Sequence, residues 1–143
     1  MNTRSDTRSR TPAAPTARPG AGAYGPSRIG TPAQARQLVC HTLAALGPLP
    51  PDQIDDLLLV TSELVTNAHR HGGGVTDFGI AVGPDRVTVS VADASGEAPR
   101  HDLHDELRPG GFGWPIVLRL CREVTVASCL DGKTIHAAVT VDR

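Results

Sequence analysis

An acidic and an amide side chain, Glu63 and Asn67, lie four residues apart in the stretch 61–71. In an α-helix, with about 3.6 residues per turn, this spacing puts both side chains on one face. An amide oxygen can bind a hard cation such as Mg²⁺, and a carboxylate one turn away can orient or deprotonate a nucleophile. Taken alone, this pattern is more often a solvated helix face. Its meaning therefore depends on the rest of the chain.

Two helices are expected to precede the glycine run at 72–74. Residues 31–46 have a typical N-cap, Thr31, followed by proline and then by apolar residues at helical spacing. A second long helix, capped by Asp52 and running through His71 into the glycines, carries Glu63 and Asn67. Beside that polar pair lies an apolar stripe that should pack on a sheet: Ile54, Leu57, Leu58, Thr61, Leu64, Val65 and Ala68.

Two hairpins are expected from alternating β-branched residues. Residues 75–82 and 87–91 form the first, joined by a Gly-Pro-Asp turn at 83–85. Residues 124–129 and 133–141 form the second, across a turn that contains glycine. The last strand starts with Lys133 and Thr134. A lysine or threonine at such a place is normally solvated, at the edge of the strand.

Asp93 follows the second expected strand and opens a loop that contains Gly96. A carboxylate at this place in a cleft can accept a hydrogen bond from a ligand amine. The same residues also make ordinary turns, so this signal is weak by itself.

A glycine-rich loop, including Gly111 and Gly113, runs into a helix over 114–121. Backbone N–H groups at such a junction can bind phosphate, although no Gly-Lys-Ser/Thr follows as it would in a Walker loop. A flexible loop before a core helix is the other reading. The preceding polar stretch, 100–109, could serve as a mobile lid. Its two histidines, His101 and His104, lack an obvious third metal ligand.

Composition limits the classes of function. A chain of 143 residues with 39% hydrophobic residues, 20% charged residues and a net charge of -1 is ordinary for one domain, and it has no basic excess for nucleic acid. No apolar run reaches the roughly 18 residues that a membrane helix needs, so we expect a cytoplasmic protein. Residues 1–30 are rich in arginine and proline and predict a disordered basic tail, which leaves 31–143 as the folded domain.

Three cysteines, Cys40, Cys121 and Cys129, are odd in number and far apart. They fit neither a disulfide framework nor a metal-binding pair, and we expect reduced thiols. Cys40 and Cys121 should lie on helices and Cys129 in a strand.

The order of these features resembles the GHKL ATP-binding domain of anti-sigma-factor serine kinases and of related stand-alone regulators. The resemblance covers residues 31–143 and rests on four motifs: Ser-Glu-Leu-Val-Thr-Asn-Ala at 62–68 with His71, Val-Ala-Asp at 91–93 with Pro99, Gly-Phe-Gly-Trp-Pro-Ile-Val at 111–117, and Gly-Lys-Thr-Ile at 132–135. It implies an α/β (α+β) two-layer sandwich of the Bergerat type, with a mostly antiparallel or mixed sheet and helices on one face.

For the phosphate end, the resemblance implies three roles. Asn67 would hold the Mg²⁺ that bridges the phosphates of ATP, and Glu63 would act as general base or would orient water. Gly111 and Gly113 would line the triphosphate with their backbone N–H groups.

For the base end, the resemblance implies that Asp93 accepts the adenine amino group. Gly96 would let the base come close, and Thr134 would support the contact through its hydroxyl group or a water molecule.

The function implied is an anti-sigma factor that phosphorylates an anti-anti-sigma (STAS-type) partner and releases or captures a sigma factor. A homodimer is also compatible with the resemblance. The alternative is a binding switch that responds to nucleotide without kinase chemistry; a plain ATPase is a third reading. Glu63 favours the kinase, since a binding protein does not need that carboxylate. Phe112 favours the switch, because many stand-alone members have arginine there.

Overall fold

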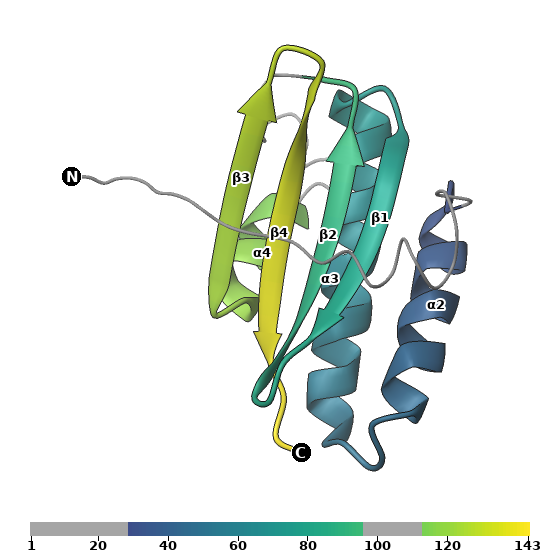
Figure 1. Ribbon diagram of the computed structural model, residues 1–143, viewed down its shortest axis with the longest axis vertical. Coiled ribbons are helices and arrows are strands. Elements are labelled where there is room, and N and C mark those ends of the chain that lie inside the picture. Colours follow the sequence, from purple (N-terminus) through teal and green to yellow (C-terminus); the bar gives the residue numbers. More distant parts are fainter. Residues whose placement is uncertain (1–28, 96–112) are drawn as a thin grey trace, which may run out of the picture.

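Three helices and a four-stranded antiparallel sheet form two layers in the computed structural model, which describes residues 29–95 and 113–143 (Figure 1). The elements are α2 (Pro32–Ala44), α3 (Pro51–His71), β1 (Val75–Val82), β2 (Arg86–Asp93), α4 (Gly113–Leu120), β3 (Glu123–Cys129) and β4 (Gly132–Thr140). The strand order is β1-β2-β4-β3, and the helices lie on one face of the sheet. This confirms the predicted α+β two-layer architecture. The prediction of a tail concerns residues that lie mostly outside the described part.

Helix α2 begins as the sequence predicts. The hydroxyl group of Thr31 accepts a hydrogen bond from the Gln34 amide at 3.1 Å, and the Gln34 side chain accepts one from the Thr31 amide at 3.2 Å. This reciprocal pair satisfies two of the amides that a helix start leaves unpaired. The buried residues Ala35, Val39 and Leu43 belong to the main core, and α2 packs on α3.

Helix α3 starts two residues earlier than a cap at Asp52 predicts. Its N-cap position is Pro50, which makes no side-chain cap, so the expectation that Asp52 caps the helix is wrong. Asp52 instead lies in the first turn, where a negative charge interacts favourably with the helix dipole. The helix ends at His71 with Gly72 as its C-cap, and its last turn is closed by hydrogen bonds from the Gly72 and Gly74 amides to the Ala68 carbonyl.

The predicted apolar stripe of α3 is largely correct, although it omits one buried residue. Leu57, Thr61, Leu64, Val65 and Ala68 are buried, as expected, and Val60 is buried with them. Ile54 and Leu58 are partly buried at the edge of the core. Thr61 can occupy an apolar layer because its hydroxyl group donates to the Leu57 carbonyl at 2.7 Å.

Strands β2 and β4 provide the inner face of the sheet. In β2 every second residue is buried: Val87, Val89, Val91 and Asp93. In β4 the buried positions Lys133, Ile135, Ala137 and Val139 stand opposite them in register. Because alternate residues of a strand point to opposite faces, all eight side chains face the helices.

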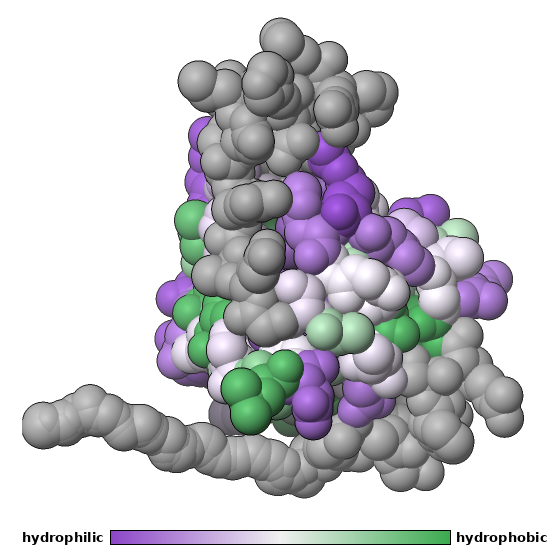
Figure 2. Space-filling view, turned by 90° about the horizontal axis from the view of Figure 1, so that it is seen from above, coloured by the Kyte–Doolittle hydropathy of each residue, from purple (hydrophilic) through white to green (hydrophobic). Residues whose placement is uncertain are grey.

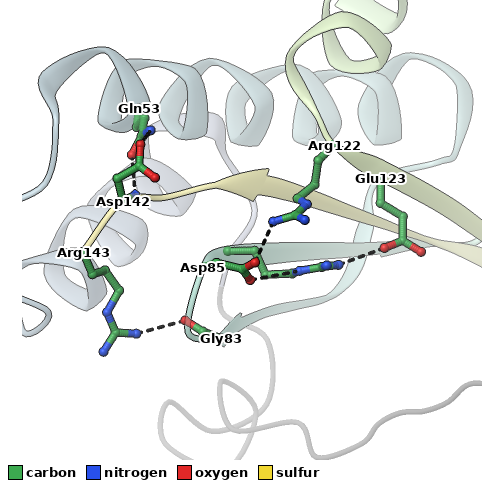
Figure 3. Close-up of polar contacts among 8 residues, drawn as sticks. Gln53, Gly83, Asp85, Arg122, Glu123, Asp142 and Arg143 are labelled. Atoms are coloured by element: carbon green, nitrogen blue, oxygen red, sulfur yellow. Dashed lines mark hydrogen bonds and ion pairs between the residues drawn. The ribbon is translucent and has the colours of Figure 1, made fainter.

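Polar contacts close the end of the sheet at which the β1–β2 turn lies (Figure 3). Arg122 donates to Asp85 at 3.1 Å, and Arg143 donates to the Gly83 carbonyl at 2.9 Å. Gln53 and Asp142 exchange two hydrogen bonds of 2.7 Å, which tie the C-terminal segment to the start of α3. This end is therefore held by the protein's own side chains.

The three cysteines are free thiols. Cys40 lies in α2 and Cys129 ends β3, as predicted. Cys121 lies one residue after α4 rather than within it, although its amide still donates to the Val117 carbonyl at 3.1 Å. Among the described helices, none has the length and apolarity to cross a membrane.

Candidate functional site

Glu63 and Gly113 meet where α3 packs against the start of α4. Glu63 is partly buried, and a β-carbon placed on Gly113 would stand 2.6 Å from its Oε2 atom. The fold thus brings the glycine motif at 111–117 against the carboxylate of the motif at 62–68. Because Gly113 has no side chain, its backbone can lie directly in front of the Glu63 carboxylate.

Asn67 lies one turn after Glu63 and carries an unpaired buried atom. Its Nδ2 atom is buried and has no hydrogen-bond partner in the described residues. A buried amide without a partner typically costs about 1–3 kcal/mol, unless a ligand satisfies it. Rotation of the amide by a half-turn would put Oδ1 in the same place, so this position can offer a donor to phosphate or an acceptor to a cation. The donor set thus fits the implied magnesium and phosphate.

The charge of Glu63 depends on its surroundings. Burial raises the pKa of this carboxyl group above its ordinary value, and the positive charge of Arg70 lowers the pKa in part. A carboxylate with a raised pKa is a better proton acceptor than a solvated one. Arg70 was not predicted as a site residue. The signal was its position seven residues after Glu63, two helical turns further along the same side of α3.

Asp93 forms the second half of the site, at the end of β2. Its Oδ2 atom accepts a hydrogen bond from Lys133 Nζ at 2.7 Å, and its Oδ1 atom accepts one from the Ser95 amide at 2.9 Å. Gly72 lies directly against the carboxylate, because a β-carbon there would overlap the Asp93 side chain. The Ala94 amide donates to the Gly72 carbonyl at 3.0 Å, which ties the end of β2 to the end of α3.

Lys133, rather than Thr134, faces Asp93. The register pairs Asp93 with Lys133 and Ala92 with Thr134, so strand alternation turns Thr134 toward the opposite face of the sheet. The Lys133 side chain is 1% exposed, and the prediction that it is a solvated strand edge is therefore wrong. The sequence did contain a signal that Lys133 faces inward. Ile135, Ala137 and Val139 alternate as inward residues, and the same period puts Lys133 on their face.

The two halves of the site lie at the same end of the molecule, where α3 and β2 end and β4 begins (Figure 1). Gly72, which contacts Asp93, follows Asn67 by five residues and Glu63 by nine. At about 1.5 Å per residue, these separations are about 7.5 Å and about 13.5 Å along the helix axis. Seen from above this end, hydrophilic residues gather beside the grey atoms (Figure 2).

The structure places some predicted site residues and not others. Glu63 lies against Gly113, Asn67 lies one turn further along α3, and Asp93 lies near the end of α3. Gly96 and Gly111 are outside the described residues, as are His101 and His104. In the described part of the chain, no three His, Cys, Asp or Glu side chains are grouped to hold a metal ion. A magnesium ion here would thus need oxygen ligands from phosphate and water, which is its usual preference.

Comparison with known families gives a match over most of the chain. Residues 29–138 match a family model described as a histidine kinase-like ATPase domain. A search of curated proteins found no match.

Proposed function

Because the chain belongs to the family of histidine kinase-like ATPase domains, we propose that it is an anti-sigma factor with serine-protein kinase activity. The family membership confirms the predicted relationship to GHKL-type ATP-binding domains, and it implies an ATP-binding regulatory protein. The kinase activity, the anti-anti-sigma (STAS-type) partner and the sigma factor come from the resemblance in the sequence and are the proposal.

The contact between Glu63 and Gly113 carries the proposal. Phosphoryl transfer depends mainly on positioning and on neutralisation of charge, with one residue that orients the nucleophile or accepts its proton. The carboxylate of Glu63, with its raised pKa, lies against the backbone of the glycine motif that is proposed to line the phosphates. A protein that only binds nucleotide does not need a proton acceptor at this place.

The other site residues are assigned by their surroundings. Asn67 holds the magnesium or a phosphate oxygen with its unpaired amide, and Arg70 adds positive charge to the same face of α3. Asp93 accepts the amine of the base with the acceptor capacity that Lys133 and Ser95 leave free. Magnesium, when bound, neutralises phosphate charge.

The test uses the full chain with γ-labelled ATP, Mg²⁺ and a purified STAS-type protein. Label should appear on a serine or threonine of the partner. Glu63→Gln, which keeps the size of the side chain and removes the proton acceptor, should reduce transfer by about 100-fold or more, in the range typical of general-base loss. Equal transfer by wild type and Glu63→Gln would refute the role of Glu63.

The alternative is a nucleotide-gated switch, and the phenylalanine at position 112 favours it, since a cation is missing from the glycine motif. In that case no label reaches the partner, and the affinity for the partner changes with ATP equally in wild type and in Glu63→Gln. Calorimetry of the partner complex, with and without ATP, distinguishes the two functions.

A further inference from the structure

Lys133 is a buried cation with unused hydrogen-bonding capacity. It is the single lysine of the sequence, and its side chain is 1% exposed. An ammonium group has three N–H donors, and burial is costly unless they are paired. In the described residues, Asp93 is the one partner of the Lys133 ammonium group, at 2.7 Å. Two donors therefore remain for an acceptor that the described chain does not supply.

A purely structural role does not require these charges. Lys133 and Asp93 are already opposite each other in the backbone ladder of β2 and β4, so the strands are paired without their side chains. Apolar residues of similar volume often stabilise a protein as well as a buried ion pair does. The neighbours above and below on the same face, Val91 and Ile135, are apolar. The change from apolar to charged occurs at the end of the sheet where the site lies.

Asp93 and Lys133 together present an acceptor and a donor side by side. Asp93 retains lone pairs after its bonds to Lys133 and Ser95, and Lys133 retains N–H donors. The edge of adenine that carries its amino group presents the complementary order: the N6 amine donates, and the adjacent ring atom N1 accepts. Thr134 is turned to the other face of the sheet and cannot serve this edge directly.

We propose that Lys133 is a specificity-determining residue that donates a hydrogen bond to N1 of the adenine base, while Asp93 accepts from the adjacent amine. This inference rests on the proposed nucleotide site and adds a direct, charged contact to the base. Asp93 and Lys133 together select a base that carries an amine beside an unprotonated ring nitrogen.

The first experiment changes the ligand and leaves the protein intact. The full chain is titrated by calorimetry with Mg-ATP and with 1-deaza-ATP, in which a C–H group replaces N1. We expect 1-deaza-ATP to bind about tenfold more weakly or worse, as for the loss of one hydrogen bond to a charged group. Equal affinity would overturn the role of Lys133 and leave the proposed function standing. Failure of both nucleotides to bind would overturn the proposed function and this inference with it.

The second experiment changes the protein. Lys133→Met keeps the length and apolar volume of the side chain and removes the donors, so its preference for ATP over 1-deaza-ATP should disappear. Because this substitution leaves a buried carboxylate unpaired, the double variant Asp93→Asn with Lys133→Met is measured beside it, and it should also lack the preference. Arg143→Met, at the far end of the sheet, should keep the wild-type preference. A preference retained in a folded Lys133→Met variant would overturn the inference.

Discussion

The backbone of Gly113 lies against the carboxylate of Glu63, so closely that a β-carbon at position 113 would stand 2.6 Å from Oε2. The two residues are 50 positions apart in the chain, and the β1–β2 hairpin lies between them. Their contact joins two motifs that the sequence could only list separately. It also explains why glycine occupies the first position of α4, where alanine would be a better helix former.

Gly113→Ala should reduce activity with little effect on folding. The new methyl group would displace Glu63, whose carboxylate is the flexible end of a long side chain and can move at low cost. We expect phosphoryl transfer to fall about tenfold or more, since small displacements of a catalytic group have effects of this order. Gly79→Ala is the matched control, because a β-carbon there meets no atom within 4 Å. Full activity in Gly113→Ala would show that this contact does not position Glu63.

The pH profile should report the raised pKa of Glu63. A proton acceptor works as the carboxylate, so activity should fall on the acid side through a pKa above the ordinary 4.5. This fall on the acid side of the pH profile should be absent from any residual activity of Glu63→Gln.

Stability should show the same shift with a defined sign. Because the folded-state pKa lies above the unfolded one, the native state binds this proton more tightly. The contribution of Glu63 to stability is therefore greatest below the unfolded pKa and is lost as pH rises through the folded pKa. Glu63→Gln should unfold in urea at a concentration at least equal to that of wild type at pH 8. A lower midpoint there would contradict the burial of the charge.

Gly72→Ala should destabilise the fold. A methyl group there would overlap the Asp93 side chain, which is buried and held by Lys133, so neither group can move away cheaply. We expect a loss of about 1–3 kcal/mol, typical of overpacking, in urea unfolding followed by circular dichroism. Gly79→Ala serves again as the control and should change stability by less. Equal stability of both variants would mean that the carboxylate is not confined against Gly72.

The buried and the exposed ion pairs should differ in their contribution. Lys133→Met leaves the Asp93 carboxylate buried and unpaired, and should cost about 3–5 kcal/mol. The double variant Asp93→Asn with Lys133→Met should be more stable than Lys133→Met alone, since no isolated charge remains. Glu123→Gln, which breaks the solvent-exposed pair with Arg86 at 2.9 Å, should cost about 1 kcal/mol or less. Similar costs at the two places would refute the burial of the Lys133–Asp93 pair.

Cysteine labelling should follow exposure and thiol acidity. Burial, together with the negative charge of Asp56, raises the pKa of Cys121 to about 11, while Cys40 and Cys129 are exposed. Because the thiolate is the reactive form, iodoacetamide at pH 8 should modify Cys40 and Cys129 first. Peptide mass spectrometry resolves the three sites. Rapid labelling of Cys121 in the folded protein would contradict its partial burial.

The sequence by itself determined the local elements and predicted most of the candidate site residues. Apolar repeats at helical spacing, alternating valines and glycine-containing turns are local signals, so β1 was predicted with its observed bounds and α3 within two residues of its start. Glu63 and Asn67 could be predicted as a pair on one face because four residues of helix fix their relative direction whatever the rest of the chain does. Asp52 was misjudged as a cap because Pro50 and Asp52 compete for that position and local preference does not decide the phase of the first turn.

Only the tertiary structure decided which residues meet. The pairing of β2 with β4 joins positions 40 to 54 residues apart, and its register puts Lys133 against Asp93 and turns Thr134 away. A shift of one residue would have exchanged the two, and neither hairpin sets the register between them. The packing of α4 on α3 likewise put Gly113 against Glu63. Which residues pair across the sheet depends on long-range packing. The charge and the space around each candidate site residue therefore could not be predicted from the sequence alone.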